Sequence, residues 1–246
     1  MNNWTGHTIL ITGGGTGIGL AFAKRLLQDG NKVILVGRRK DVLEKVKQET
    51  PAFEYIVGDV GSEQGRIDLY QAAITRFPTV NVIFNNAGIQ RLVQIQNPGS
   101  DWKTVQSEID INLSAPIHLS ILFSDHLLKQ PSAAIINVTS GLSFIPYVNC
   151  PVYASTKAAL HSFTWSLRSQ YKNTNVKIIE VVPPAVDTDL QAPGLHKFGV
   201  NVDVFADSVY GRLKNGEDEV GYGMAEESRV LFKDAFSHKF NALNNH

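Results

Sequence analysis

Short apolar runs alternate with longer segments of helical period along most of this chain. Six runs have the length and composition of buried strands: residues 9–11, 33–36, 55–57, 80–84, 134–138 and 176–182. Helical periodicity lies between them, over residues 18–27, 41–49, 63–76, 101–128 and 153–171. Continuous apolar strands that alternate with helices are typical of a parallel sheet covered on both faces. The pattern therefore predicts an α/β fold with a mostly parallel sheet.

Length and composition fit one domain of this kind. The chain has 246 residues, of which 43% are hydrophobic and 19% are charged, as in ordinary globular proteins. No repeat, low-complexity tract or linker divides it, so we predict a single domain over residues 1–246. The 23 basic and 23 acidic side chains cancel, which leaves no overall field to attract nucleic acid or an anionic membrane. Function is therefore expected from a local site.

The sequence also indicates where the protein works. Cys150 is the only cysteine, so no internal disulfide forms and a reducing compartment is favoured. The first residues contain no basic leader, and the apolar run over residues 8–12 is far shorter than the roughly 20 residues of a membrane span. We expect a cytoplasmic protein with neither a membrane nor a nucleic-acid partner.

A glycine-rich loop directly follows the first predicted strand. Residues 12–19 read Thr-Gly-Gly-Gly-Thr-Gly-Ile-Gly and lead into the first helical segment. Glycines permit a tight turn and close approach of the backbone, and a helix N-terminus offers free amide groups to a phosphate. Such a loop can serve only as a turn, but the flanking strand and helix favour a dinucleotide site. The candidate contacts are Gly13, Gly15, Thr16, Gly17, Ile18 and Gly19.

The end of the second predicted strand indicates which dinucleotide fits. An acidic side chain about 20 residues beyond the loop would hold a free ribose 2′-hydroxyl. The chain instead reads Gly37-Arg38-Arg39-Lys40. Guanidinium groups suit a 2′-phosphate, so Arg38 and Arg39 favour NADP(H) over NAD(H). The alternative interpretation is an exposed basic turn before a helix.

Two further motifs carry candidate catalytic chemistry. Tyr153 and Lys157 lie four residues apart, on one face if the segment is helical, and Ser140 ends the fifth strand upstream. A Tyr and a Lys at this spacing often arise by chance. Together with the glycine loop, the Asn-Asn-Ala-Gly sequence at 85–88 and Asn112, however, they form a specific order of five features. This order resembles the short-chain dehydrogenase/reductase family over residues 8–188.

The resemblance implies a single Rossmann-type doubly wound domain with about seven strands. It also implies an NADP(H)-dependent oxidoreductase that interconverts a carbonyl compound, a ketone or an aldehyde, and an alcohol. In the family pattern Ser140 holds the substrate carbonyl and Tyr153 is the general acid in reduction. Lys157 binds the nicotinamide ribose and lowers the pKa of the tyrosine, and Asn112 helps to hold a water that links the lysine to solvent. Family members commonly pair through long helices, so a homodimer or homotetramer is expected.

Further cofactor contacts are implied by the same resemblance. Asn86, Ala87 and Gly88 match the motif that lines the adenine side, and Asp59 and Val60 match the acidic position near the adenine ring. Pro183, Val186 and Thr188 match the terminal segment, where the threonine meets the nicotinamide carboxamide. The family usually has glycine at position 184. Pro184 stands there in this chain, and proline fixes φ and removes a hydrogen-bond donor.

The proposed acid–base role of Tyr153 needs a large pKa shift. A free tyrosine has a pKa of about 10, so work near neutrality requires a shift of roughly 3 units, or about 4 kcal/mol. An ammonium group about 5 Å away supplies on the order of 3 kcal/mol at an effective dielectric constant of 20. We therefore expect Lys157 to supply most of the shift and an oxidised nicotinamide the remainder. The alternative for Ser140, Tyr153 and Lys157 is a satisfied polar cluster.

The substrate side of the site carries weaker signals. Leu142, Tyr147 and Cys150 lie between the catalytic serine and tyrosine, and Leu190 follows Thr188. Facing each other, these segments would form an apolar pocket for a neutral carbonyl compound, although core packing explains them equally well. A substrate lid is predicted over about 187–215 because Pro and Gly interrupt the alternation there. The scattered histidines predict no metal site.

Two other functions remain open from the sequence. A nucleotide-binding sensor or scaffold would keep the fold and use NADP(H) only as a ligand, because fold does not dictate function. The intact set of Ser140, Tyr153 and Lys157 argues against that class. An epimerase or dehydratase of the longer related type is the third hypothesis, but those proteins usually carry an added substrate domain.

Overall fold

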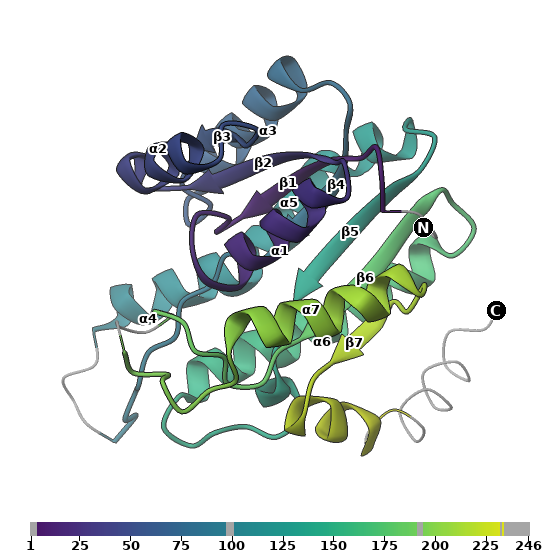
Figure 1. Ribbon diagram of the computed structural model, residues 1–246. Helices are drawn as coiled ribbons and strands as arrows, with labels where there is room; N and C mark the ends of the chain where they lie inside the picture. Colours follow the sequence, from purple (N-terminus) through teal and green to yellow (C-terminus); the bar gives the residue numbers. More distant parts are fainter. Residues whose placement is uncertain (1–3, 97–100, 191–193, 232, 234–246) are drawn as a thin grey trace.

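The computed structural model describes residues 4–96, 101–190, 194–231 and 233. This part of the chain contains one sheet of seven parallel strands in the order β3-β2-β1-β4-β5-β6-β7 (Figure 1). The strands are β1 (Thr8–Thr12), β2 (Lys32–Gly37), β3 (Glu54–Val57), β4 (Val80–Asn85), β5 (Ala133–Val138), β6 (Val176–Val182) and β7 (Glu219–Gly221). The predicted parallel α/β sheet is thereby confirmed, and the short β7 adds a strand that no apolar run predicted.

Helices cover both faces of the sheet (Figure 1). One layer holds α1 (Gly17–Gln28), α2 (Lys40–Glu49) and α7 (Val202–Lys214), and the other holds α3 (Glu63–Arg76), α5 (Ala115–Leu128) and α6 (Pro151–Tyr171). Successive strand residues point to opposite faces. Ile9 and Ile11 of β1 therefore join the first core, while Leu10 joins the second. Both sides of the strands are buried, which explains their continuous apolar sequences.

The strand order places the candidate site at the carboxyl ends of the strands. β1 pairs in parallel with β2 on one side and with β4 on the other, so the direction of winding reverses between β1 and β4. Ligands of doubly wound folds bind outside the carboxyl ends of the strands at such a reversal. The glycine loop follows β1 there, and the segments that contain Asn86, Ser140 and Pro183 follow β4, β5 and β6.

The helical stretch predicted over 101–128 contains a π turn. The carboxylate of Asp101 accepts hydrogen bonds from the amides of Lys103 and Thr104, which starts α4 (Trp102–Ile109). The π-helical segment η1 (Asp110–Ser114) then joins α4 to α5. Asn112 lies inside this segment. π turns are rare and frequently occur at functional sites.

The predicted lid over 187–215 covers two different structures. Its second half is α7, whose Phe205 and Val209 are buried in the core against α1. Arg25 of α1 also forms ion pairs with Asp203 and Asp207 of α7. This helix is thus part of the packed domain, while Thr188, Leu190 and the segment up to 201 precede it; residues 191–193 lie outside the described part. Movement of this region as a lid stays a prediction.

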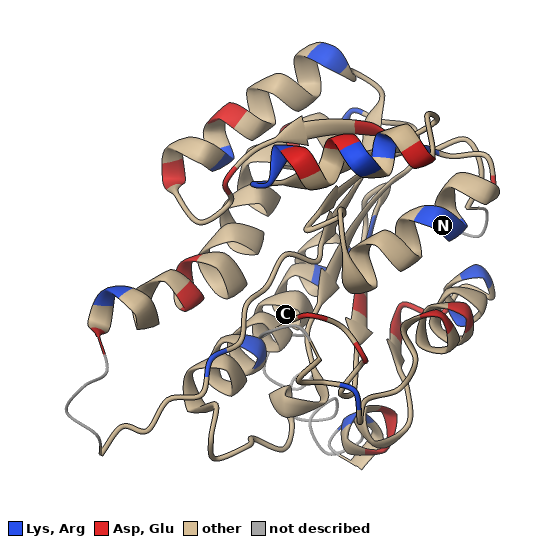
Figure 2. Ribbon diagram, turned by 60° about the vertical axis from the view of Figure 1, so that its left-hand side comes forward, with Lys and Arg blue, Asp and Glu red and all other residues tan. Residues whose placement is uncertain are grey.

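Charged residues of both signs occur on the helices that cover the sheet. Figure 2 shows acidic and basic residues interspersed on the outer helices, in keeping with the zero net charge. Among the described residues no helix is both long and apolar enough to cross a membrane. No group of three metal-ligating side chains comes together within those same ranges. The cytoplasmic location and the homo-oligomer stay predictions.

Candidate active site

The glycine loop is packed tightly against the segment that follows β4. A Cβ atom added at Gly19 would lie 2.5 Å from the carbonyl oxygen of Gly13 and 2.5 Å from the side-chain nitrogen of Asn86. That nitrogen donates to the carbonyl oxygens of Thr12 at 3.0 Å and Gly13 at 3.2 Å. Gly13 and Gly17 have φ values of +64° and +52°, which favour glycine. The loop is therefore held in one conformation by contacts that only glycine permits.

The start of α1 fits a dinucleotide pyrophosphate. Thr16, the N-cap residue, makes no side-chain cap bond, and the first turn of α1 contains no acidic residue. The first-turn amides of a helix have no intrahelical acceptor and carry the positive end of its dipole, so an anionic group is favoured there. Thr188 lies beside this turn, because a Cβ atom at Gly17 would be 3.3 Å from its methyl group. The structure thus brings together two segments predicted to hold the cofactor.

The residues predicted to contact the adenosine half of the cofactor also lie at the carboxyl ends of the strands. Arg38 and Arg39 follow β2 with both side chains exposed, and Arg39 is the N-cap residue of α2. Asp59 follows β3 and accepts a hydrogen bond from the amide of Gly61, while Val60 is buried in the second core. The backbone amides of Asn86 and Ala87 both donate to the hydroxyl of Thr12, each at 3.0 Å. These contacts fix the segments after β1, β3 and β4, and neither arginine side chain has a hydrogen-bond or ion-pair partner among the described residues.

Ser140 lies directly beyond β5. It caps the short helix η2 (Gly141–Ser143), and its hydroxyl accepts a hydrogen bond of 3.1 Å from the amide of Leu142. The amide of Gly141 donates to the carbonyl oxygen of Pro183 at 2.9 Å, which joins the segments after β5 and β6. Pro184 therefore does not prevent contact between these two segments. The serine hydroxyl is left with its own proton to donate to a ligand.

Tyr153 and Lys157 lie in the first two turns of α6, which begins with Pro151 at its first position. Both side chains are buried, with 7% of Tyr153 and 4% of Lys157 exposed. The ammonium nitrogen of Lys157 is 5.7 Å from the centre of the Tyr153 ring and donates to the carbonyl oxygen of Val138 at 2.8 Å. Because Val138 ends β5, two residues before Ser140, the three predicted catalytic side chains meet at the end of this strand.

Burial dominates the pKa values of Tyr153 and Lys157, so the net Tyr153 shift is upward and not toward neutrality as expected. Burial raises the pKa of the Tyr153 phenol, and a hydrogen-bonding interaction with Ser140 only partly opposes that rise. Burial also lowers the pKa of Lys157 to about 8. Removing a charged group from water disfavours its charged form, phenolate and ammonium alike. Burial thus sets the net direction of both pKa shifts, upward for the phenol and downward for the ammonium, while the contribution of Lys157 to the Tyr153 pKa stays a prediction.

Asn112 ties three parts of the site together. Its side-chain oxygen accepts from the amide of Ile89 at 2.9 Å, and its side-chain nitrogen donates to the carbonyl oxygen of Ile89 at 2.8 Å. The same nitrogen donates to the hydroxyl of Thr156 in α6 at 3.3 Å. The π turn is thereby bound both to the segment after β4 and to the helix that carries Tyr153 and Lys157.

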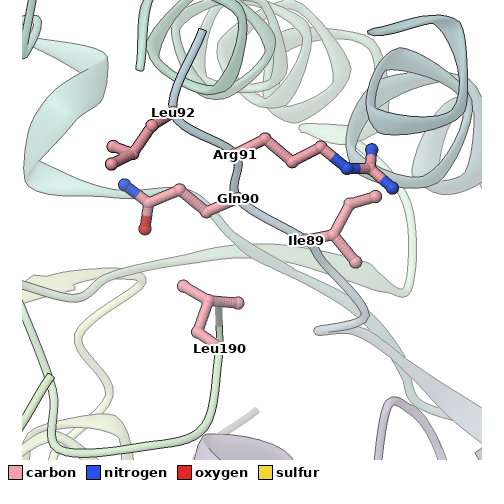
Figure 3. A pocket seen from close by; sticks show the side chains of 5 residues that line it. All are labelled: Ile89, Gln90, Arg91, Leu92 and Leu190. Atoms are coloured by element: carbon pink, nitrogen blue, oxygen red, sulfur yellow. The ribbon is translucent and has the colours of Figure 1, made fainter. Parts of the chain in front are cut away.

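A pocket of about 410 Å³ opens along the segment after β4, which Asn112 binds at Ile89 (Figure 3). Its lining residues are Ile89, Gln90, Arg91, Leu92 and Leu190. The amide of Gln90 lies between Leu92 and Leu190, whereas the guanidinium of Arg91 points away from Leu190 (Figure 3). That guanidinium donates to the carbonyl oxygen of Thr104 and to the hydroxyl of Ser107. The pocket therefore presents polar and apolar surface in about equal measure, with three aliphatic side chains and the amide of Gln90.

Only one of the four predicted substrate residues lines this pocket. Leu190 does, whereas Cys150 is fully buried and receives a hydrogen bond of 3.3 Å from Gln90. Tyr147 is exposed and accepts from the side chain of Asn149, and Leu142 is half-buried beside Ser140. The sequence analysis missed residues 89–92. Their position directly after the 85–88 motif, at the carboxyl end of β4, is the signal that points to them.

Comparison with known proteins agrees with this geometry. A family profile described as short chain dehydrogenase matches residues 7–197. "Uncharacterized oxidoreductase DltE" of Bacillus subtilis (strain 168) is 41% identical over 98% of this chain and 97% of its own length.

Two solved structures show the same fold at 26% identity. A short chain dehydrogenase from Burkholderia cenocepacia in complex with NADP has a TM-score of 0.79 and covers 98% of both chains. An alcohol dehydrogenase from the archaeon Thermococcus sibiricus, complexed with 5-hydroxy-NADP, has a TM-score of 0.78 over 88% of this chain and 95% of its own. With its parallel sheet, glycine loop and matching family profile, this chain belongs to the short-chain dehydrogenase/reductase family of oxidoreductases.

Proposed function

We propose that this protein is an NADP(H)-dependent enzyme that interconverts a neutral ketone or aldehyde and its alcohol. The observation that carries the proposal is the meeting of Ser140, Tyr153 and Lys157 at the end of β5. A phenol in this position supplies a proton to a carbonyl oxygen, and a hydroxyl beside it holds that oxygen. A binding protein without turnover has no need of a buried ammonium next to a buried phenol.

Each side chain has a role that follows from its surroundings. When bound, the reduced nicotinamide supplies the hydride. The Ser140 hydroxyl donates to the carbonyl oxygen and stabilises the negative charge that develops on it, an interaction that gains strength where water is excluded. Tyr153 then transfers its proton to that oxygen, and its raised pKa keeps this proton available. Lys157 provides the positive charge that limits the cost of leaving a phenolate behind.

The pocket supports a neutral substrate. Three of its five lining side chains are leucine or isoleucine, and the guanidinium of Arg91, the one cation among the five, is turned toward Thr104 and Ser107. We expect NADPH consumption with at least one member of a panel of aromatic, aliphatic and steroidal ketones, measured by loss of NADPH absorbance. Charged 2-oxo acids should react more slowly than neutral ketones of the same size. Lack of consumption with every neutral carbonyl compound would contradict the proposal.

Preference for NADP(H) is assigned to Arg38. Its exposed guanidinium lies at the end of β2, and two structurally similar proteins bind NADP or a derivative of it. We expect Arg38→Asp to lower kcat/KM for NADPH by about 10- to 100-fold, since a hydrogen bond to a charged group contributes about 1.5–3 kcal/mol. The value for NADH should stay the same or rise.

A matched control makes the same change of charge further along the chain, in α2. Lys45→Asp alters an exposed cation of α2 outside the site and should leave the ratio of the two kcat/KM values unchanged. Steady-state kinetics with both cofactors provides the comparison. A wild-type enzyme that uses NADH as well as NADPH, or an unchanged ratio in Arg38→Asp, would refute the role of Arg38.

A further inference from the structure

A carboxyl group that the proposed reaction does not use is buried behind the active site. Glu108 lies in α4, four residues before Asn112, and its exposed fraction is 0%. Among the described residues, neither of its carboxyl oxygens has a hydrogen-bond partner of normal geometry. A buried carboxylate without such partners is costly, so a residue of this kind is rarely found without a function.

The titratable groups around Glu108 belong to the active site. From the segment after β4, the backbone amide and the guanidinium of Arg91 act on it, and from α6 the ammonium of Lys157 does so. Its own charge acts in turn on Lys157 and Tyr153 of α6 and on Cys150, which precedes that helix. Glu108 is therefore coupled to both candidate acid–base side chains without belonging to their helix.

The coupling has a definite direction. Burial raises the pKa of Glu108 to about 7, although Arg91 and Lys157 oppose the rise. Once ionised, the Glu108 carboxylate raises the pKa of Lys157 and that of Tyr153, because a negative charge favours retention of a proton on both. Lys157 itself has a pKa of about 8. Glu108 thus gains its charge just below the pH at which Lys157 begins to lose its own.

We propose that Glu108 is a buried counter-charge that keeps protons on Lys157 and Tyr153 and thereby sets the alkaline limit of carbonyl reduction. It is a positioning residue, since it acts through those two side chains and does not line the substrate pocket. This inference rests on the proposed reductase function. A second measurement, which needs no substrate, tests the role of Glu108 separately from the reductase function.

The first measurement is the pH profile of kcat for NADPH-dependent reduction of 4-nitrobenzaldehyde. At pH 6, where Glu108 is largely protonated, Glu108→Gln should match the wild type. At pH 9 the variant should be about tenfold slower, because loss of an interior charge shifts its neighbours by about one pKa unit. Asp110→Asn, the same chemical change two residues further on, should follow the wild-type profile. A Glu108→Gln profile that parallels the wild type at all pH values would overturn the proposal.

The second measurement is thermal unfolding between pH 5 and pH 9 without substrate. The folded-state pKa of about 7 lies above the unfolded value of about 4.3, so ionisation of Glu108 destabilises the wild type progressively as pH rises between the two. Glutamine lacks this penalty. The melting temperature of Glu108→Gln relative to the wild type should therefore increase with pH and level off above 7. Glu108→Met should show the same trend if the glutamine variant fails to fold.

Coupling to Lys157 is tested by repeating the series in a Lys157→Met background. Loss of the ammonium removes a charge that lowers the pKa of Glu108. The rise in the melting-temperature difference between Glu108→Gln and Glu108 should therefore occur at higher pH in this background. Two results would overturn the coupling. One is a melting-temperature difference between Glu108→Gln and the wild type that does not depend on pH. The other is a midpoint pH of that difference that is the same with and without Lys157→Met. If no carbonyl compound is reduced but the midpoint moves, the proposed reaction fails while the charge coupling stands.

Discussion

Tyr153→Phe is expected to lower kcat by about 100-fold or more while NADPH binds nearly as well as to the wild type. A positioned general acid contributes about 10²–10⁴ to the rate, and phenylalanine removes the proton donor without emptying the buried site. The glycine loop and the start of α1, where the pyrophosphate is expected, do not involve this side chain. Steady-state kinetics and titration of NADPH fluorescence measure the two effects separately.

Tyr55→Phe is the matched control. Tyr55 lies on β3 at the far edge of the sheet, where its hydroxyl donates to Glu44, so its loss should leave turnover unchanged. If Tyr153→Phe kept more than about a tenth of the wild-type kcat, the proton would come from another group. The assignment of the general acid would then be wrong.

Gly19→Ala is expected to disrupt the dinucleotide site and to destabilise the domain. Its Cβ atom would lie 2.5 Å from both the Gly13 carbonyl oxygen and the Asn86 side chain, too close for either to remain in place. Forcing extra atoms into a packed region typically costs about 1–3 kcal/mol. We therefore expect a melting temperature lower by about 2–10 °C and at least tenfold weaker NADPH binding, measured by thermal unfolding and by fluorescence titration.

Gly211→Ala provides the comparison within the same protein. Gly211 lies in α7, and a Cβ atom there would meet nothing within 4 Å. Because alanine favours a helix interior by up to about 1 kcal/mol over glycine, this variant should be as stable as the wild type or slightly more stable. Equal effects of the two substitutions would contradict the close packing inferred for the glycine loop.

Much of the fold could be predicted because buried parallel strands have continuous apolar sequences. Six of the seven strands, including β1 with Ile9, Leu10 and Ile11, were apparent in this way. The strand β7 was not, since it has three residues and begins with Glu219. That glutamate is buried in β7 beside the cations of Arg229 and Arg168, and Arg168 comes from α6, far from it in sequence. Such a partner arises only from tertiary packing.

The candidate site was also predicted only in part from the sequence. The resemblance to the short-chain dehydrogenase/reductase pattern predicted that Ser140, Tyr153 and Lys157 meet, and the parallel sheet explains only why the glycine loop and Ser140, which follow strands, lie at the same ends of the strands. The sign of the Tyr153 pKa shift was not predictable. The Coulomb estimate included the attraction of Lys157 but not burial. Burial raises the pKa of the Tyr153 phenol and lowers that of the Lys157 ammonium. Glu108 was missed because a single glutamate in a polar helix gives no sign of its burial.

The transfer of deuterium from NADPH labelled at the reactive C4 position tests the central claim most directly. With a ketone that the wild type consumes, the proposed reaction places one deuterium on the carbinol carbon of the product, detected by mass spectrometry and NMR, and Tyr153→Phe forms almost none. A product without the label, or a substrate that is epimerised at unchanged oxidation state, would contradict hydride transfer between NADPH and a carbonyl group. Binding of NADPH without any conversion would favour a sensor instead.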